Sequence, residues 1–529
     1  MSAASISLPA SAEPSAGKAM NKWAVAVAVA TGALLEVIDV SIVNVALTDI
    51  QASVGATLSQ VSWVVSSYAV ANVIVLPMSA WLGQRFGKKR YFVFSLIGFT
   101  LASMLCGMAT SLSFLVFARV LQGLMGGGLL AKAQAFLYET FPREEQAVAQ
   151  GFFGAVVIAG PVLGPTLGGF ITTHSDWRWI FFINAPVGLA AVLLCLQALP
   201  RDEPSSEAPA RVDWLAIGLL ALGLGSLQTM LEEGNSEGWF DSTFISALLA
   251  VSITAMVLFV QRQLRAAQPI VDLRVLRYRS LAAGSMLSIV IGVALYGALF
   301  AVPIFATSIL HFTAQQTGLL LMPGAIASAL TMQVASRLVQ RFDPRRVLVA
   351  GGLILVISLA WLGQLSPVTG DDDLFWPLLV RAIGTVLMFL PLNLSTIGPI
   401  PKEDVAKATG IFNLTRQLGG SIGVALLSTV LDRRMIFHRD VLASHLSAND
   451  PHVVERVAQL TGVYMSKGAS EPVAHARALT TLDGLVQQQA SVLSFNDTFY
   501  IVAGLVLAFL PLVLLLGKPP TDAIPADVH

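Results

Sequence analysis

Two carboxylates lie inside the first long apolar run of the chain, residues 23–47. Glu36 and Asp39 are three positions apart, and the run holds no other charged residue. On a helix this spacing places both side chains on one face. Because charge inside a bilayer is costly, a carboxylate there usually has a partner or a function. We expect Asp39 to be the first candidate for a proton carrier and Glu36 the second; the alternative is a helix-end pair in contact with water.

A cation lies inside a later apolar run, residues 112–136. Arg119 is followed by Gln122 and Gly123. An arginine within a bilayer needs carbonyls, water or an acid as its partner. We expect Arg119 to pair with a carboxylate of the first run and to set its affinity for protons. A structural tie between two helices is the alternative, and the two interpretations are compatible.

Three more basic residues lie in apolar runs. Arg381 and Arg416, in the second half of the chain, also need partners within the bilayer. As for Arg119, a functional pairing and a structural tie between helices are both possible interpretations. Lys132 is close to the end of its run. A long basic side chain at such a position can reach the headgroups. We therefore expect Lys132 to extend toward the membrane surface.

Small residues and prolines alternate in the run 150–172. Glycines at four-residue spacing share a helical face and allow a neighbouring helix to come close, whereas prolines remove backbone donors and bend the helix. We expect a kinked, closely packed helix, suited to a bundle whose parts rock; packing alone is the alternative. The residues concerned are Gly160, Pro161, Gly164, Pro165, Gly168 and Gly169.

A short basic loop follows the second apolar run. It reads Arg85-Phe86-Gly87-Lys88-Lys89-Arg90. Positive charge in short loops marks the cytoplasmic side of a membrane protein. We expect Arg85 and Gly87 to belong to such an anchor and also to a latch between helices on that side.

The amino-acid composition limits the class of protein to which these residues belong. Of 529 residues, 12% are charged and 55% are hydrophobic. A soluble domain has roughly 25% charged residues, so the composition excludes a soluble chain and also a disordered one. A net charge of +0 offers no basic surface for nucleic acid, and two cysteines exclude a disulfide framework.

Apolar runs long enough to cross a bilayer as helices recur along the chain. The sequence therefore predicts an all-α polytopic membrane protein in contact with the lipid bilayer. The fourteen expected spans are residues 23–47, 60–82, 91–109, 112–136, 150–172, 179–199, 213–231, 241–261, 280–307, 318–337, 347–364, 374–397, 409–431 and 496–517.

Lysine and arginine gather in alternate short loops, after the second, eighth and tenth runs. This distribution predicts that both termini are cytoplasmic. Residues 432–495 then form a long polar connection on the outer side. We expect this connection to be partly helical, with Pro451 and Pro472 as breakers.

Similar residues recur in the two halves of the chain. Arg85-Phe86 is echoed by Arg341-Phe342, and Arg119 by Arg381. Duplicated halves around a central site are a common transporter design. The expected division is a cytoplasmic tail (1–22), a six-helix bundle (23–199), two inserted helices (213–261), a second six-helix bundle (280–517) that contains 432–495, and a cytoplasmic tail (518–529).

Motifs for a cofactor or for catalysis give little support to an enzyme. The sequence has no G-x-x-x-x-G-K-[ST] and no Cys/His cluster with metal-ligand spacing, so we expect no metal and no cofactor, and an ion gradient as the energy source. Residues 419–423 match a hydrolase pattern centred on Ser421, which requires a strand–turn–helix context. Helix packing is the better interpretation, and an intramembrane hydrolase remains an alternative.

Five segments carry signatures that occur together in one family. They are residues 38–47 (IDVSIVNVAL), 119–123 (RVLQG), 160–169 (GPVLGPTLGG), 177–184 (WRWIFFIN) and 413–421 (NLTRQLGGS). In this combination the chain resembles the fourteen-helix drug:proton antiporters of the major facilitator superfamily, the EmrB/QacA type. It departs from the family at Ala80 and Gln84, where a glycine and an aspartate are usual, and Glu36 adds a second acid.

The resemblance implies a major facilitator fold of two six-helix bundles plus two inserted helices. It implies proton-driven efflux of amphipathic drugs by alternating access, in the bacterial inner membrane. It also implies a tripartite system with an EmrA-type periplasmic adaptor and a TolC-like outer-membrane channel. The substrate cavity would include Asn44, Gln134, Asn413, Arg416 and Gln417. The sequence is also compatible with a dedicated exporter of one metabolite or fatty acid, and with a non-transporting membrane sensor.

Overall fold

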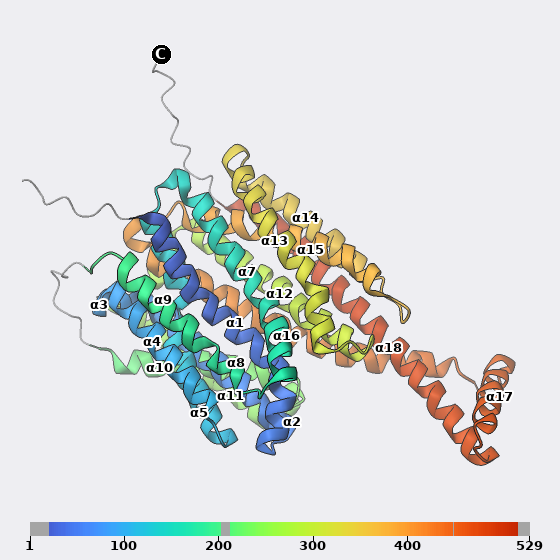
Figure 1. Cartoon of the computed structure of the whole chain (residues 1–529). Helices are drawn as coiled ribbons and strands as arrows, with labels where there is room; N and C mark the ends of the chain where they lie inside the picture. The colour runs from blue at the N-terminus through green and yellow to red at the C-terminus, as the bar shows by residue number, and fades with distance from the viewer. Residues whose placement is uncertain (1–20, 203–211, 448, 517–529) are drawn as a thin grey trace, which may run out of the picture.

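The computed structural model describes residues 21–202, 212–447 and 449–516, and within these ranges every regular element is a helix (Figure 1). Of the expected tails, 1–22 and 518–529, residues 1–20 and all of 518–529 lie outside the described residues. The N-terminal half comprises α1 (Lys22–Val54), α2 (Leu58–Val75), η1 (Leu76–Met78), α3 (Ser79–Phe86), α4 (Lys88–Gly107), α5 (Leu112–Gly126), α6 (Leu129–Thr140), α7 (Arg143–His174), α8 (Trp179–Phe182) and α9 (Asn184–Ala198).

Two helices join this half to the next: α10 (Trp214–Glu233) and α11 (Thr243–Arg265), with a short turn η2 (Trp239–Asp241) between them. After η3 (Leu273–Arg277), the C-terminal half comprises α12 (Arg279–Ser308), α13 (Ala314–Arg341), α14 (Pro344–Leu362), α15 (Asp371–Ile397), α16 (Lys402–Ser444), α17 (Pro451–Ser466), α18 (Glu471–Phe509) and η4 (Leu510–Leu515).

Every expected membrane span overlaps these helices, but several helices extend beyond it: α1 ends at Val54, α7 begins at Arg143, and α18 begins at Glu471, well before the expected start at 496. Thirteen helices of the described chain, some joined to a short neighbour, are long and apolar enough to cross a bilayer. The exception among the fourteen expected spans is 409–431, which lies inside α16. Polar residues such as Asn413, Arg416 and Gln417 lower the hydropathy of that helix, and Asn413 and Arg416 are buried against protein. The chain is a multi-pass membrane protein.

The two halves repeat the same packing. In the N-terminal half α1 packs against α7 and α9, and α5 against α2 and α4; in the C-terminal half α12 packs against α16 and α18, and α15 against α13 and α14. Between the halves, α7 packs against α13, and α16 packs against η1, α3 and α6. The pair α10–α11 lies beside this core, with α10 against α2 and α16.

One helical projection extends beyond the bundle. The helices α16 and α18 have 43 and 39 residues. They are therefore about 60 Å long at 1.5 Å per residue, roughly twice a bilayer core. Their far ends and α17 extend away from the other helices (Figure 1). The segment 432–495 is thus more helical than expected, because Pro451 and Pro472 occupy first-turn positions, where proline starts a helix.

Candidate functional site

The carboxylate of Asp39 is enclosed by donors inside the N-terminal half. Its side chain is fully buried. Arg119 Nη1 donates to Asp39 Oδ2 at 2.5 Å. Gln122 Nε2 donates to Asp39 Oδ1 at 2.7 Å, and Asn184 Nδ2 to the same oxygen at 3.1 Å. Both carboxylate oxygens are therefore held by neighbouring helices.

The guanidinium of Arg119 is equally enclosed, with 1% of the residue exposed. Its Nε donates to the carbonyl of Val64 at 2.8 Å, and its Nη1 also reaches Gln122 Oε1. The ring of Tyr68 lies 4.2 Å from the guanidinium carbon. The structure thus pairs Arg119 with Asp39, one of the two acids expected as its partner, and adds Gln122 to the pair. These contacts tie α1 to α2, α5 and α9.

Glu36 faces a different set of donors. Asn72 Nδ2 donates to Glu36 Oε1 at 2.8 Å, and the backbone N–H of Leu130 to Oε2 at 2.8 Å. Among the described residues no Lys, Arg or His nitrogen lies within ion-pair distance of this carboxylate, which is 6% exposed. Both donors are neutral, so Glu36 is a buried acid without a direct cation.

A break in one expected span creates the donor for Glu36. The run 112–136 forms two helices, α5 and α6, because Gly127 and Gly128 interrupt it. Gly128 has a φ of +81°, a conformation that favours glycine, and a Cβ at Gly127 would meet Val75 at 2.7 Å. The new N-terminus leaves backbone N–H groups free of helix partners, and Leu130 directs one of them to Glu36.

Lys132 does not extend to the membrane surface, contrary to the expectation. The residue is 8% exposed, its Nζ donates to Ser95 Oγ at 2.9 Å, and the ammonium lies 3.7 Å from the ring centre of Tyr91. The break before α6 makes Lys132 an early residue of a new helix that faces α4. The charge is therefore stabilised by a hydroxyl and an aromatic face.

A chain of polar side chains crosses between the halves. Gln134 Nε2 donates to Asn393 Oδ1 at 2.6 Å, and Asn413 Nδ2 donates to Gln134 Oε1 at 2.8 Å. Arg416 in turn donates to Asn413 Oδ1. All four residues are buried. Three of the expected cavity residues, Gln134, Asn413 and Arg416, are thus neighbours at the contact of α6 with α15 and α16.

The central cavity lies beside this chain and has a volume of about 50 Å³. Both halves line it, from Val37 of α1 and Pro161 of α7 to Tyr296 of α12. It also contains two buried guanidiniums, Arg381 and Arg416. Among the described residues, Arg381 Nε and Arg416 Nη1 have no hydrogen-bond partner, and neither side chain has an ion-pair partner. The cavity therefore contains two buried guanidiniums without a direct acid partner among the described residues.

The two remaining expected cavity residues lie apart from this group. Asn44 is exposed, and its amide donates at 3.4 Å to the carbonyl of Val40 in its own helix. Gln417 is half-buried one position beyond Arg416. Of the five expected cavity residues, Arg416 alone is among the described residues that line the central cavity.

The glycine face of α7 packs on the acid-bearing helix. A Cβ at Gly160 would meet Val37, one at Gly164 would overlap Ser41, and one at Gly168 would meet Ile42 at 3.0 Å. These contacts flank Glu36 and Asp39 on α1. The remaining motif residues, Pro161, Pro165 and Gly169, lie inside the same helix, where the carbonyl of Gly169 accepts from Thr173 Oγ1 at 2.6 Å.

The basic loop is held by acids that lie far along the chain. Gly87, with a φ of +91°, separates α3 from α4, and Asp202 accepts from the backbone N–H groups of Lys89 and Arg90 at 2.8 and 3.0 Å. Lys88 pairs with Glu139 at 2.7 Å. Arg85 stacks near Trp81, 5.6 Å from the ring centre. Asp202 and Glu139 thus provide acid contacts to the loop although Gln84 replaces the usual aspartate.

Two amide side chains of this site were not expected from the sequence. Asn72 binds Glu36, and Asn184 binds both Asp39 and Ser103 Oγ. Asn72 could have been noticed in the sequence as an amide inside an otherwise apolar run. Asn184 could have been noticed as the last residue of the WRWIFFIN segment.

Comparison with known proteins gives the family of the chain. The family model described as Major Facilitator Superfamily matches residues 29–424. The "Multidrug export protein EmrB" of Escherichia coli (strain K12) is 31% identical over 498 residues, 94% of this chain and 95% of that protein. The "Fatty acid resistance protein FarB" of Neisseria gonorrhoeae is 29% identical over 486 residues, 92% and 94% of the two chains.

Among solved structures, the human organic anion transporter MFSD10 (TETRAN) has a similar fold. The TM-score is 0.58 at 12% sequence identity, with 93% of this chain and 99% of that chain covered.

Proposed function

The chain belongs to the major facilitator superfamily, and on that premise we propose that it is a proton-driven exporter of amphipathic drugs. The observation that carries this proposal is the central cavity, where two similarly packed halves meet beside Glu36 and two arginines that form no ion pair with a described residue. At about 50 Å³ the cavity is far smaller than the ~300–1,000 Å³ of sites for drug-sized ligands. Export therefore requires the halves to rock apart, as in alternating access.

The contacts favour Glu36 over Asp39 as the proton carrier, the reverse of the order expected from the sequence. Protonating Asp39 leaves the buried Arg119 without its counter-ion, which is costly. Protonating Glu36 breaks no ion pair with a described residue. Glu36 also interacts electrostatically with Lys132 in its own half and, more weakly, with Arg416 in the other half. The proposal assigns proton transfer to Glu36 and the positioning of α1 to the Asp39–Arg119 pair.

The cavity favours compounds that carry an acidic group. Arg381 and Arg416 present donors without described partners, and a carboxylate or phenolate would neutralise a buried positive charge there. The same observation, together with the name of the FarB relative, supports the second candidate function, a dedicated exporter of one fatty acid or metabolite.

Transport from loaded proteoliposomes distinguishes these functions. Under an imposed pH gradient, we expect the exporter to move several unrelated amphipathic compounds. Compounds that bear an acidic group should reach half-maximal transport at a lower concentration than those that do not. Export of a single fatty acid or metabolite would favour the dedicated exporter. Movement of none of the panel would contradict both and favour a sensor.

An intramembrane hydrolase is a weaker alternative. Within the described chain, Ser421 Oγ accepts from Gln228 Nε2 at 2.8 Å and donates to the carbonyl of Gln417. Neither partner is a general base. Ser421→Ala is therefore expected to leave transport unchanged, and loss of all activity in this variant would support the hydrolase.

We also propose a bacterial inner-membrane location with both termini cytoplasmic. In that orientation the projection formed by α16, α17 and α18 faces outward. It exposes apolar side chains, among them Phe437, Val463 and Leu479. An EmrA-type adaptor, itself linked to a TolC-like channel, would cover them. If the proposal holds, replacing residues 451–466 by a short flexible linker abolishes co-purification with such an adaptor while the protein still folds; unchanged co-purification would contradict it.

A further inference from the structure

A second and larger cavity lies at the base of the projection. Its volume is about 650 Å³, within the ~300–1,000 Å³ range of sites for drug-sized ligands. It is formed by the end of α12, by α16 and by α18, with Asn235 of the α10–α11 turn closing one side. It shares no lining residue with the central cavity.

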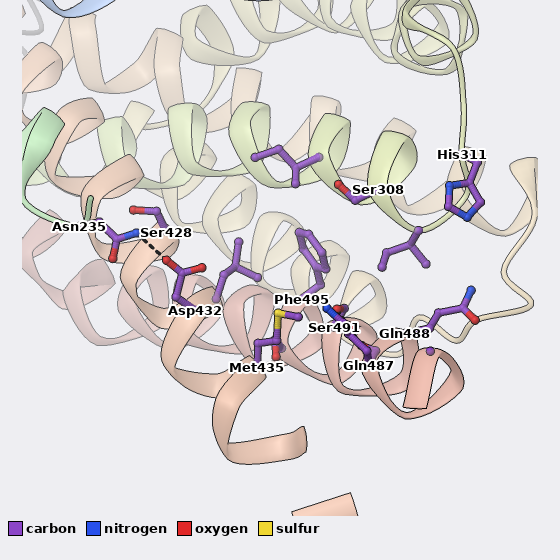
Figure 2. Close-up of a pocket in the computed structure, with 15 residues that line it drawn as sticks. Asn235, Ser308, His311, Ser428, Asp432, Met435, Gln487, Gln488, Ser491 and Phe495 are labelled. Atoms are coloured by element: carbon purple, nitrogen blue, oxygen red, sulfur yellow. Dashed lines mark hydrogen bonds between the residues drawn. The ribbon is translucent and has the colours of Figure 1, made fainter. Parts of the chain in front are cut away.

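The lining of this cavity is amphipathic. Its apolar surface comes from Phe495, Met435 and Leu431. Amide and hydroxyl groups from α12, α16 and α18 provide the polar part of the lining. Figure 2 shows Asn235 and Asp432 at one end, His311 at the other, and Phe495 between them. A ligand with an apolar body and one polar end fits this distribution.

Asp432 gives the cavity its charge. Asn235 Nδ2 donates to Asp432 Oδ2 at 2.6 Å, which fixes the side chain toward the cavity. Among the described residues no basic nitrogen forms an ion pair with it, and His311 is the one other titratable group in the lining. Of the two cations that follow Asp432, Arg434 is engaged by Asp497 at 2.5 Å, and Arg433 is exposed and is not among the residues that line the cavity. The free carboxylate oxygen is therefore available to a cation.

One end of the cavity includes a residue in an uncommon backbone conformation. His311, in the turn after α12, has a φ of +55°. Non-glycine residues hold such angles only where the surrounding structure requires them, and they are enriched at ligand sites.

We infer that this cavity binds amphipathic cations through Asp432, as a second ligand site with a selectivity opposite to that of the arginine-lined central cavity. This inference rests on the proposed function and extends it to the substrate class of a separate site.

The test uses two probes of matched shape and opposite charge. Tetraphenylphosphonium and tetraphenylborate are titrated against the purified full-length protein in detergent. Asp432→Asn is expected to weaken binding of the phosphonium about tenfold and to leave that of the borate unchanged, because only the cation loses a charge partner. Asp440→Asn, an exposed acid on the same helix outside the lining, is the matched control and changes neither affinity.

A labelling measurement places the probe. Both native cysteines, Cys106 and Cys195, are buried, so a bulky maleimide reports on an introduced thiol. Bound phosphonium is expected to protect a Ser491→Cys variant at least fivefold against labelling, and not a Ser444→Cys variant outside the cavity. Equal protection of both variants, or equal phosphonium affinity of the native protein and Asp432→Asn, would overturn the inference.

A third variant distinguishes failure of the cation site from failure of the acidic preference proposed for the central cavity. Arg381→Gln is expected to weaken tetraphenylborate about tenfold without affecting the phosphonium. If borate binding were indifferent to Arg381 while Asp432→Asn still weakened the phosphonium, the acidic preference of the central cavity would fail and the cation site would stand. Absence of phosphonium binding to the native protein would overturn the cation site alone.

Discussion

At the scale of single residues, the site separates two acids that the sequence presents as a pair. Asp39 is saturated by three donors, one of them an arginine, whereas Glu36 has neutral donors only. The spacing of three predicted that both lie on one buried face, and both do. It could not predict their partners, because Asn72, Leu130 and Asn184 come from three other helices.

The Asp39–Arg119 pair makes a testable contribution to stability. Removing one partner of a buried pair strands the other charge and costs about 3–5 kcal/mol. We expect Arg119→Ala to lower the unfolding midpoint in detergent clearly, whereas Arg439→Ala, which breaks a half-exposed pair with Asp483, costs less than about 1 kcal/mol. The double variant Asp39→Asn/Arg119→Ala should recover part of the loss. A double variant less stable than Arg119→Ala alone would contradict the ion-pair explanation.

Glu36 should control coupling and not folding. Glu36→Gln keeps the shape and one carbonyl acceptor but cannot release a proton, so we expect drug-driven proton flux in proteoliposomes to fall at least tenfold while the unfolding midpoint stays near native. Asp39→Asn is expected to lower both flux and stability. Full proton flux in Glu36→Gln would assign the proton to another acid.

At the scale of elements, close packing of α7 on α1 positions both acids. The four-residue spacing of Gly160, Gly164 and Gly168 predicted a close helix contact, and the structure supplies the partner.

The break in the span 112–136 was less predictable. The glycines at 127 and 128 divide an expected single span because the turn there packs against Val75 and Ser79 of the preceding helices, and such tertiary contacts are invisible in hydropathy. The same break explains why Lys132 is buried.

Alanine substitutions of two helical glycines should have opposite effects. A Cβ at Gly164 would overlap Ser41 and lie 2.9 Å from the backbone nitrogen of Ile42, so Gly164→Ala forces α1 and α7 apart. We expect a loss of about 1–3 kcal/mol, seen as a lower unfolding midpoint, together with reduced export. Gly218→Ala in α10 meets no atom within 4 Å and should stabilise slightly, since alanine favours helix. Equal midpoints for the two variants would argue against close packing as the role of the motif.

At the scale of the whole molecule, repeated residues in the sequence predicted two related halves, and matching helix pairs do form in each. The sequence could not predict how the halves meet. Their contact depends on pairs distant in the chain, such as Gln134 with Asn393 and α7 with α13. These contacts adjoin the small central cavity, so alternating access requires them to separate in each transport cycle.

A reversible lock across the halves tests this requirement most directly. An ideal Cβ at Gly151 of α7 lies 3.3 Å from Ser336 Cβ of α13, close to the ~3.5–4.5 Å of a disulfide. The native thiols are buried, so oxidation can be directed to a Gly151→Cys/Ser336→Cys variant. The two single variants are the controls.

The measurement is drug-driven proton flux of this double variant in proteoliposomes, before oxidation, after oxidation and after reduction. The account predicts that oxidation stops drug and proton movement together, that reduction restores both, and that the single variants do not respond. Proton and drug movement that continue with the disulfide formed would contradict alternating access by separation of the two halves.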